Sequence, residues 1–590
     1  MRLPSVHLRH LMHTTLRVSM SKNTTKQARD GCLSSAAEPG SRLKNPFRLS
    51  AVRPQSAMSS RSTSVSTQAQ SNSAQRVTRL ASLAVLVAAL TLAAFRLGSV
   101  GLTSPKHQAG GGASIAASPP GPITLTVASN HPDKSFSPGA IGLSVELDEL
   151  ETGDLNLRRT SLVGLMRLLG PGVLRLGGNS LEYAWWTSAG EAPPAWATSV
   201  IDPAELIALR KLLAATGWRV ILGVDLGHFN ATRAADEASV ARHILGSHLL
   251  GFEIGNEPNF YGSPQVHLRP SSYGVGNYLQ EVTAYAVAMR AAAPGIRLYG
   301  PDLSSEGWLH TVASVKGSSF SQITQHYYPT VYSVQRGTCE GTSMPTALQL
   351  LSPQTRDREN TTLKLLVEAG ETAGRETRIS ETNTTASCDT DGGPNTSPVF
   401  ASALWALDWA LRASSAGVSG LDFHGYFGRC GPDTFSPICA PGRSAEERGL
   451  VIARPEYYGL LAARQLEGGR FVPVQVNRKS ALESLTVYAT HHPDGSVTLA
   501  VDNLSSSNPS SLLLKMPGYD RASYEGLDAP SIDSTHGVTF DDTTIDPSDI
   551  VLPTAKRLPR MSGGAFRLLV KPASAVIVTL HRKTSTRAPG

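Results

Sequence analysis

From Pro122 to about residue 470, short apolar runs alternate with longer stretches of helical character. Short apolar runs bounded by turn residues are typical of strands buried on both faces, as in a parallel sheet. Such runs lie at Ile141–Leu147, Val173–Leu176, Arg219–Asp225, Leu250–Ile254, Ile296–Gly300, Gln322–Tyr328, Thr377–Ser380 and Gly420–His424. Eight strands separated by helices predict an α/β fold, a (β/α)8 TIM-type barrel with its active site at the C-terminal strand ends.

Two of the intervening helices have recognisable starts. Asp202-Pro203 precedes ELIALRKLLAATG, and Ser397-Pro398 precedes VFASALWALDWALRA. Each pair combines a capping side chain with a proline at the first helical position, where the missing N–H is not needed. The sequence therefore predicts helices that begin at Pro203 and at Pro398.

The pattern changes near Phe471, where the helices stop. Short β-like runs such as SLTVYATHH, SVTLAVDNL and SAVIVTL follow, separated by Asp-Gly, Pro-Gly and Gly-Gly turns. We therefore expect a catalytic barrel over 123–470 and an antiparallel β-sandwich over 471–585. The run ITLTV at 123–127, ahead of the first barrel strand, is a candidate to supply one strand of the sandwich.

The N-terminal part of the chain has a different composition. Residues 1–79 are rich in Ser, Arg, Thr and Gln, which predicts a disordered basic tail. The uncharged apolar run at 80–95 follows two arginines, so 80–97 is interpreted as a signal peptide or a signal anchor. A Gly/Ala/Ser/Pro-rich linker follows at 98–122. Either alternative places the catalytic part outside the cell or in a lumen, secreted or membrane-anchored.

The basic charge of the chain is confined to this tail. The whole chain carries a formal charge of +7, whereas residues 1–79 hold 13 Lys/Arg and two acidic residues, a net of +11. The remainder therefore carries 7 − 11 = −4. Nucleic-acid binding needs a basic face on a folded part, so we exclude nucleic acid as a partner.

Cysteines and glycosylation sequons agree with that compartment. Four cysteines after the apolar run, an even number, predict two disulfides, with Cys430–Cys439 as the natural local pair; free buried thiols are the alternative. Acceptor sequons occur too. The cysteines are Cys339, Cys388, Cys430 and Cys439, and the sequons begin at Asn230, Asn360, Asn395 and Asn503.

The sharpest local motif is GFEIGNEP, Gly251 to Pro258. Its apolar residues lead into Glu257, which therefore falls just past a buried strand, at the rim of the barrel. A carboxylic acid at that place can protonate a departing oxygen, although a glutamate before proline is also an ordinary helix start. Glu253 lies within the same strand, and its side chain is expected on the same face as that of Glu257. We interpret Glu253 as a supporting group.

A second strand-end carboxylate occurs in RISETN, Arg378 to Asn383. If Glu257 ends the fourth strand, Glu381 ends the seventh, and those two ends face each other across a barrel mouth. Two carboxyl groups about 5–5.5 Å apart can cleave a glycosidic bond by double displacement with retained configuration.

These motifs together resemble glycoside hydrolase family 79, which contains β-glucuronidases and heparanases. The resemblance covers about residues 123–580 and implies a barrel with a β-sandwich and the retaining mechanism. The matching segments are GLSVEL with Glu146, VLRLGGNS with Arg175 and Asn179, GFEIGNEP with Glu257, QHYYP with Tyr327 and Tyr328, RISETN with Glu381, LDFHGYF with His424 and Tyr426, and PEYYGLLAARQL.

The resemblance also implies roles for these residues. Glu257 would be the general acid/base and Glu381 the nucleophile. Arg175 either contacts the nucleophile or braces the barrel floor beneath it, and His326 is interpreted as a satisfied core histidine. The Gly177-Gly178 pair is expected to make a tight turn. The expected substrate-binding residues are Glu146, Asn179, Asn256, Tyr328, Gly392 and Tyr426, supported by Arg175 and His424.

One segment departs from the family pattern. After the nucleophile, glucuronidases of this family carry a short loop with a tyrosine and glycines that hold the substrate carboxylate. Here the loop TNTTASCDTDGGPN is longer, lacks a tyrosine and carries Asp389 and Asp391. Backbone N–H groups near Gly392-Gly393 can still bind an anion, but two carboxylates oppose a charged sugar. A neutral glycoside therefore stays open.

The sequence thus predicts a retaining β-glycoside hydrolase that needs no cofactor or metal and acts on a glycoside or oligosaccharide. Exo-acting β-glucuronidase is the first reading. Endo-β-glucuronidase of the heparanase type and β-glucosidase-type specificity are alternatives. The net negative charge of the chain after residue 80 counts against a sulfated polymer as the substrate. A hypothesis of another class is a catalytically inactive, membrane-anchored carbohydrate-binding protein.

Overall fold

The computed structural model describes residues 121–128, 132–332, 343–387, 392–546 and 554–582. The chain divides into two units, Met1–Ile115 and Ala116–Gly590, and the described residues belong to the second. The expectations for the tail, for the apolar run at 80–97 and for the linker up to residue 120 lie outside them, as do Cys339, Cys388, Asp389 and Asp391. No helix of the described ranges has the length and apolar character needed to cross a membrane.

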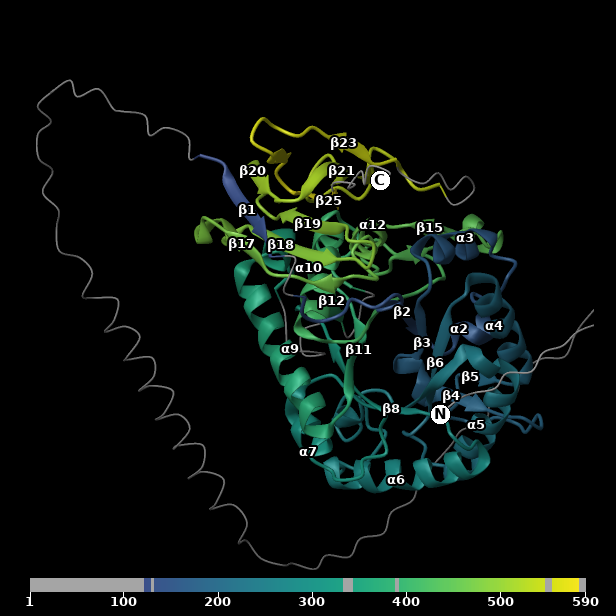
Figure 1. Ribbon diagram of the computed structural model, residues 1–590. Coiled ribbons are helices and arrows are strands. Elements are labelled where there is room, and N and C mark those ends of the chain that lie inside the picture. The colour runs from purple at the N-terminus through teal and green to yellow at the C-terminus, as the bar shows by residue number, and fades with distance from the viewer. Residues whose placement is uncertain (1–120, 129–131, 333–342, 388–391, 547–553, 583–590) are drawn as a thin grey trace, which may run out of the picture. The chain divides into compact units, whose positions relative to one another are not determined.

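A closed barrel of parallel strands forms the larger part of the described residues (Figure 1). Its order is β11-β13-β2-β3-β6-β7-β8-β9, and the pairing of β13 with β2 closes it. The predicted barrel is confirmed, with each expected strand within a few residues of its place. The strands are β2 (Ile141–Glu146), β3 (Val173–Gly177), β6 (Arg219–Val224), β7 (Leu249–Ile254), β8 (Leu298–Leu303), β9 (Gln322–Tyr327), β11 (Glu376–Thr382) and β13 (Leu421–Gly425).

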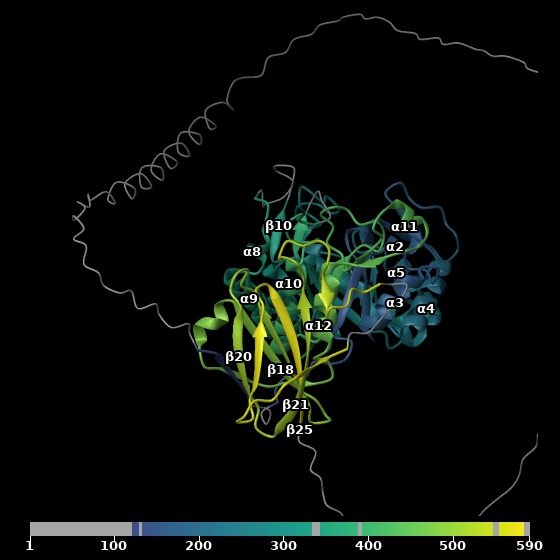
Figure 2. The same cartoon turned by 90° about the horizontal axis from the view of Figure 1, so that it is seen from above.

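Helices connect the strands and cover the outside of the barrel (Figures 1 and 2). The longer ones are α3 (Thr160–Leu169), α4 (Pro203–Thr216), α5 (Ala231–Leu245), α6 (Val275–Ala292), α9 (Pro353–Ala373), α10 (Ala401–Ala416) and α12 (Pro455–Arg464). Short ones are α2 (Glu149–Thr152), α7 (Leu309–Ala313), α8 (Ala347–Leu350) and α11 (Arg443–Glu447). Helix α4 begins at Pro203 as predicted, because Asp202 and Glu205 form a capping box there.

The predicted start at Pro398 is wrong, because α10 begins at Ala401. The Ser397 hydroxyl does not cap the helix; it accepts from the Gly393 N–H at 3.0 Å and bonds to the Thr384 hydroxyl at 2.8 Å. The backbone N–H groups at the helix start are satisfied from another part of the chain: Ala401 donates to the Ile532 carbonyl at 2.9 Å. A tertiary contact therefore replaces the local cap.

The C-terminal strands form two packed sheets. One has the order β17-β1-β20-β24 and the other β16-β18-β19-β25-β21-β22, with β23 on β21. The strands are β1 (Ile123–Val127), β16 (Arg470–Phe471), β17 (Val474–Val476), β18 (Leu485–His491), β19 (Val497–Asn503), β20 (Ser510–Lys515), β21 (Tyr519–Asp528), β22 (Thr539–Phe540), β23 (Lys556–Leu558), β24 (Phe566–Val570) and β25 (Ser574–Arg582).

The sandwich is antiparallel with one exception among the described pairs: β1 lies between β17 and β20 and runs parallel to β20. A parallel pair needs a long connection, and here the whole barrel lies between the two strands in the chain. The sequon at Asn503 is also corrected as a glycosylation site, because Asn503 is fully buried and its amide donates to the Lys571 carbonyl at 2.8 Å.

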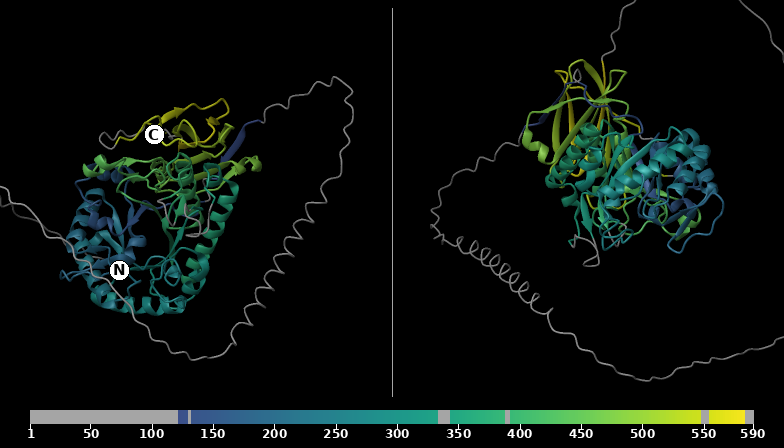
Figure 3. Two further views of the ribbon diagram at one scale, coloured as in Figure 1. Left: turned by 180° about the vertical axis from the view of Figure 1, so that it is seen from behind. Right: turned by 90° about the horizontal axis from the view of Figure 1, so that it is seen from below.

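Helices α10 and α12 lie between the barrel strands and the sandwich, a layering that is also seen from behind (Figures 1 and 3). One apolar cluster runs through this boundary and includes Ala500 and Ile577 of the sandwich together with the barrel core. A polar contact spans it as well, since the Tyr488 hydroxyl donates to Asp408 on α10 at 2.7 Å. The barrel and the sandwich are therefore joined by a shared apolar core and by this hydrogen bond.

Candidate active site

The two predicted carboxylates lie at the C-terminal ends of their strands. Glu381 is the sixth residue of β11, and Glu257 follows β7 by three residues. One oxygen of Glu257, one oxygen of Glu381 and a ring nitrogen of His326 all lie within 4.8 Å of one another. The barrel therefore brings together the two groups that the sequence singled out, and adds a histidine between them.

Glu381 is held by hydrogen bonds on both of its oxygens. Arg175 Nη1 donates to Oε2 at 2.6 Å, and the Tyr328 hydroxyl donates to Oε1 at 2.8 Å. Burial alone would raise the pKa of Glu381, but the positive charges of His326, His424 and Arg175 outweigh it and lower the pKa to about 2. The carboxylate is therefore ionised and fixed in orientation, as a nucleophile requires.

Arg175, on β3, is fully buried at the centre of the site. Its five N–H donors all meet acceptors: Glu253 at 2.8 Å, Ser144 at 3.2 Å, Glu381, Asn256 at 2.8 Å and Asp302. Of the two predicted alternatives, the structure shows direct contact, here with Glu381. Because Arg175 also binds Asn256 and the β7 residue Glu253, it fixes the Glu257 side of the site relative to Glu381.

Two consecutive glycines make room for this arrangement. A Cβ on Gly177 would lie 2.4 Å from the Arg175 guanidinium carbon, and one on Gly178 would lie 2.3 Å from the Glu146 carboxyl. Gly178 also has a left-handed φ of 71°. The predicted turn is present, but the larger reason for the pair is the space needed by two charged side chains.

Glu257 has a more open environment than Glu381. Its side chain is 22% exposed, against 9% for Glu381. The residue has a left-handed backbone with φ 48° and ψ 51°, which is uncommon for a residue with a side chain. Its N–H donates to the Asp302 carbonyl at 3.0 Å, and Oε1 lies 3.0 Å from His326 Nδ1. Glu257 thus combines a left-handed backbone with a side chain that is more exposed than that of Glu381.

His326 was interpreted as a satisfied core histidine, and this reading is incomplete. It is buried and both ring nitrogens have partners, but those partners are the site carboxylates: Nδ1 meets Glu257, and Nε2 meets Asp302 at 2.8 Å. Burial lowers the pKa of His326, while the charges of Asp302 and Glu381 outweigh that effect and raise it well above its ordinary value. His326 is therefore a cation beside both carboxylates.

The remaining predicted residues lie around this core. Glu146 accepts from the N–H groups of Asn179 at 3.2 Å and Ser180 at 2.7 Å. Asn256 donates to Asn179 at 3.4 Å. His424 Nε2 lies 3.5 Å from Glu146. Glu146, Asn179, Asn256 and His424 thus join Glu381 and Arg175 in one connected network.

Tyr426 and Gly392 complete the predicted set at its edge. The ring of Tyr426 lies 5.7 Å from that of His424, edge to face. Gly392 has a φ of 147°, and a Cβ there would come within 2.4 Å of the Asp433 carbonyl oxygen. Both residues therefore adjoin the network through the segment that follows β13.

Sequence reasoning missed two buried acids that organise the site. Asp302, at the end of β8, contacts Arg175 and His326 and accepts from the Ser380 hydroxyl. Glu182 accepts from the backbone N–H of Asn256 at 2.8 Å and of Leu226 at 3.0 Å. Asp302 sits in the unremarkable segment YGPDL; its position at a predicted strand end was the one available signal.

The spacing of Glu257, His326 and Glu381 resembles that of metal ligands, but the donor set does not fit an ion. Both ring nitrogens of His326 already meet carboxylates, Nδ1 at 3.0 Å from Glu257 and Nε2 at 2.8 Å from Asp302. The Arg175 guanidinium already neutralises Glu381 at 2.6 Å. Two carboxyl groups at this separation can instead act on a ligand held between them, one by proton transfer and the other by nucleophilic attack.

No family model and no curated protein sequence matches the chain. The structure is similar to a 4-O-α-L-rhamnosyl-β-D-glucuronidase from Fusarium oxysporum (20% identity, TM-score 0.62, covering 78% of this chain and 100% of the other). It is also similar to an α-L-arabinofuranosidase from Thermotoga maritima (16%, 0.57, 78% and 99%) and a family 51 arabinofuranosidase from Xanthomonas axonopodis pv. citri (13%, 0.55, 78% and 100%). These likenesses establish the architecture, a barrel with a β-sandwich that glycoside hydrolases use.

Proposed function

We propose that this protein is a retaining β-glycoside hydrolase. The observation that carries the proposal is the pair of strand-end carboxyl groups, whose oxygens lie within 4.8 Å. Retaining enzymes hold the two carboxyl groups about 5–5.5 Å apart, whereas inverting enzymes need about 6.5–9.5 Å for an intervening water. The different surroundings of the two groups support Glu381 as the proposed nucleophile and Glu257 as the proposed general acid/base.

In the first step Glu381 attacks the anomeric carbon while Glu257 gives its proton to the departing glycosidic oxygen. The products are a covalent glycosyl-enzyme and the free aglycone. In the second step Glu257 removes a proton from water, which attacks the anomeric carbon and releases Glu381. Arg175 and Tyr328 hold Glu381 throughout, and burial and the Glu381 charge raise the pKa of Tyr328, so that its hydroxyl stays a donor.

For the sugar, we propose an exo-acting β-glucuronidase. The motif resemblance to family 79 supports this specificity, and so does the likeness to a rhamnosyl-glucuronidase. Asn256 and Glu146 both bond to Asn179 in the network, and they are the proposed partners of the sugar hydroxyls. Backbone N–H groups near Gly392 are the proposed partners of the sugar carboxylate.

A neutral β-glycoside is the second candidate, because two observations oppose an anionic sugar. The Gly393 N–H is already engaged with the Ser397 hydroxyl at 3.0 Å. Glu146, held by two N–H groups, has a lowered pKa although burial opposes it, since His424 and Ser180 stabilise its charge. A fixed carboxylate in the pocket repels a uronate.

A panel of aryl β-glycosides tests the proposal. We expect hydrolysis of the aryl β-glucuronide with β-glucuronate as the first product in proton NMR. Faster cleavage of the β-glucoside would replace the glucuronidase assignment with the neutral-glycoside one. Random shortening of a uronate polymer would indicate the endo-acting alternative. Binding without hydrolysis of any glycoside would favour the non-catalytic carbohydrate-binding alternative.

We also propose that the catalytic part is secreted or faces a lumen. The Cys430–Cys439 disulfide supports an oxidising compartment, and the sequons at Asn230, Asn360 and Asn395 lie at exposed positions. N-terminal sequencing and glycan analysis of the protein from its own cells test this. An unprocessed, unglycosylated chain with free thiols would overturn the assignment.

A further inference from the structure

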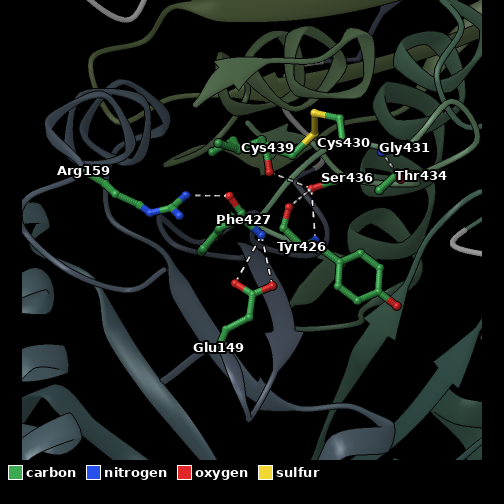
Figure 4. Close-up of a disulfide and its surroundings, with 10 residues drawn as sticks. Glu149, Arg159, Tyr426, Phe427, Cys430, Gly431, Thr434, Ser436 and Cys439 are labelled. Carbon is green, nitrogen blue, oxygen red and sulfur yellow. Dashed lines mark hydrogen bonds between the residues drawn. A yellow bond between two sulfur atoms is a disulfide. The ribbon is translucent and has the colours of Figure 1, made fainter. Parts of the chain in front are cut away.

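The loop closed by Cys430 and Cys439 follows β13, the strand that carries His424. We call residues 430–439 the disulfide loop (Figure 4). Inside it, the Gly431 N–H donates to the Thr434 hydroxyl at 2.7 Å, and the Ser436 hydroxyl donates to the Ile438 carbonyl at 2.7 Å. The loop thus has a fixed backbone conformation.

The segment between β13 and the disulfide loop is held by contacts with residues near α2. The Glu149 carboxylate on α2 accepts from the Phe427 N–H at 3.0 Å, and Arg159 donates to the Phe427 carbonyl at 2.8 Å (Figure 4). Asp154 pairs with Arg159 in turn. The N-terminal flank of the loop is therefore tied to Glu149 and Arg159.

One side chain of the loop reaches the proposed catalytic network. Phe435 is 6% exposed, and its ring centroid lies 5.8 Å from Tyr328, 5.6 Å from His424 and 5.8 Å from Tyr426. A Cβ on Gly392 would lie 3.0 Å from Phe435. A single ring thus packs against four of the predicted site residues, two of which, Tyr328 and His424, lie within 4 Å of Glu381.

We propose that Phe435 is a positioning residue, which the disulfide loop presses against Tyr328 so that the Tyr328 hydroxyl stays bonded to Glu381. The proposal rests on the proposed function of Glu381. Tyr328 follows the last residue of β9, so the strand ladder does not fix its ring. Packing must therefore hold its rotamer, and a loose partner would let the 2.8 Å bond to Glu381 lengthen.

The test is Phe435→Leu, with Phe566→Leu as the matched control. Phe566 is fully buried in the sandwich, so its loss lowers stability without reaching the site. For Phe435→Leu we expect kcat/KM to fall about tenfold, mainly through kcat, because misplacing a catalytic group by about an ångström costs up to about 100-fold. Equal losses in the two variants, at matched melting temperature, would overturn the proposal.

A double-mutant cycle separates positioning from a general structural role. In Tyr328→Phe the bond to Glu381 is already absent, so adding Phe435→Leu should lower kcat/KM less than about twofold further. A full tenfold loss in that background would show that Phe435 does not act through Tyr328. Replacing the bridge, Cys430→Ala with Cys439→Ala, should lower kcat/KM in the same direction, and an unchanged kcat would exclude a role for the disulfide.

A structural measurement keeps this inference apart from the proposed function. Wild-type protein that hydrolyses none of the glycosides would end the functional proposal and leave this one to be decided by crystallography. In the Phe435→Leu crystal structure we expect the Tyr328 hydroxyl to have left Glu381. A bond unchanged from 2.8 Å would overturn the positioning role.

Discussion

The end of β11 and the segment after β7 each bring one glutamate to the same place, with oxygens within 4.8 Å, but the two carboxyl groups have different surroundings. Around Glu381 the partners are Arg175, Tyr328 and two histidines, and the side chain is 9% exposed. Around Glu257 the described hydrogen-bond partner is His326, and the side chain is 22% exposed.

The difference shows how one residue type can take two roles. A carboxylate surrounded by positive charge and donors stays ionised and still, which suits attack on carbon. A more exposed carboxyl group, positioned by a left-handed backbone and with His326 as its side-chain partner, can exchange protons with a leaving group and with water. Four variants test this comparison.

The largest effect is expected from Glu381→Gln. No other group in the described network can replace the nucleophile, so kcat for an aryl glycoside should fall roughly 10⁴–10⁶-fold. Steady-state kinetics measure it, with Glu368→Gln, an exposed glutamate on α9, as the control expected to keep wild-type rates. Residual activity above a hundredth of the wild-type rate would contradict the assignment of Glu381 as the nucleophile.

Glu257→Ala should have the next largest effect, and one that depends on the substrate. We expect a loss of about 10²–10⁴-fold with a poor leaving group and a smaller loss with an activated aryl group, because the latter leaves without a proton. Azide should partly restore turnover by attacking the glycosyl-enzyme in place of activated water. The product, identified by NMR, should be a β-glycosyl azide; an α-product would contradict retention.

His326→Gln removes the positive charge that lies beside both Glu257 and Glu381, and it should shift the pH dependence of kcat/KM. Without it the pKa of Glu381 rises from about 2, so the acidic limb of kcat/KM should move up by about one pH unit. His310→Gln, on the exposed face of α7, is the control. An unmoved acidic limb would show that His326 does not set the charge of Glu381.

His326→Gln should also lower the thermal stability of the protein, by an amount that depends on pH. The pKa of His326 is raised above 6.5, so its ion pairs stabilise fully below that pH and are lost as pH rises through the folded-state value. The lowered pKa of Glu381 stabilises above about 4.5 and is lost as pH falls towards 2. His326→Gln should therefore lower the melting temperature most near pH 5–6, as calorimetry can measure.

The smallest effect on activity is expected from Glu253→Gln, at a residue within β7. Burial, followed by the charge of Asp302, raises the pKa of Glu253, so the carboxyl is protonated at neutral pH and glutamine resembles it. Its oxygen can still accept from Arg175. Activity at pH 7 should change less than about threefold, and a loss of 100-fold would show that Glu253 works as an anion.

The barrel and the placement of two carboxyl groups at its strand ends were predictable from the sequence for a simple reason. Buried parallel strands need continuous apolar runs, and catalytic residues of a barrel lie where those runs end. Glu257 and Glu381 satisfied both conditions. The helix start at Pro398 failed, because the N–H groups at that end are satisfied by Ile532 in a segment far away in the chain.

The sequence by itself determined the architecture, the two carboxylates and the local Cys430–Cys439 pair, since each depends on short-range pattern or spacing. The tertiary structure alone decided which charges neighbour them. Asp302 and His326 come from the ends of β8 and β9, and Phe435 comes from the disulfide loop. They meet Arg175 or Tyr328 only when the barrel closes. Protonation and orientation depend on neighbours within a few ångströms, and such neighbours are set by closure of the sheet and not by distance along the chain.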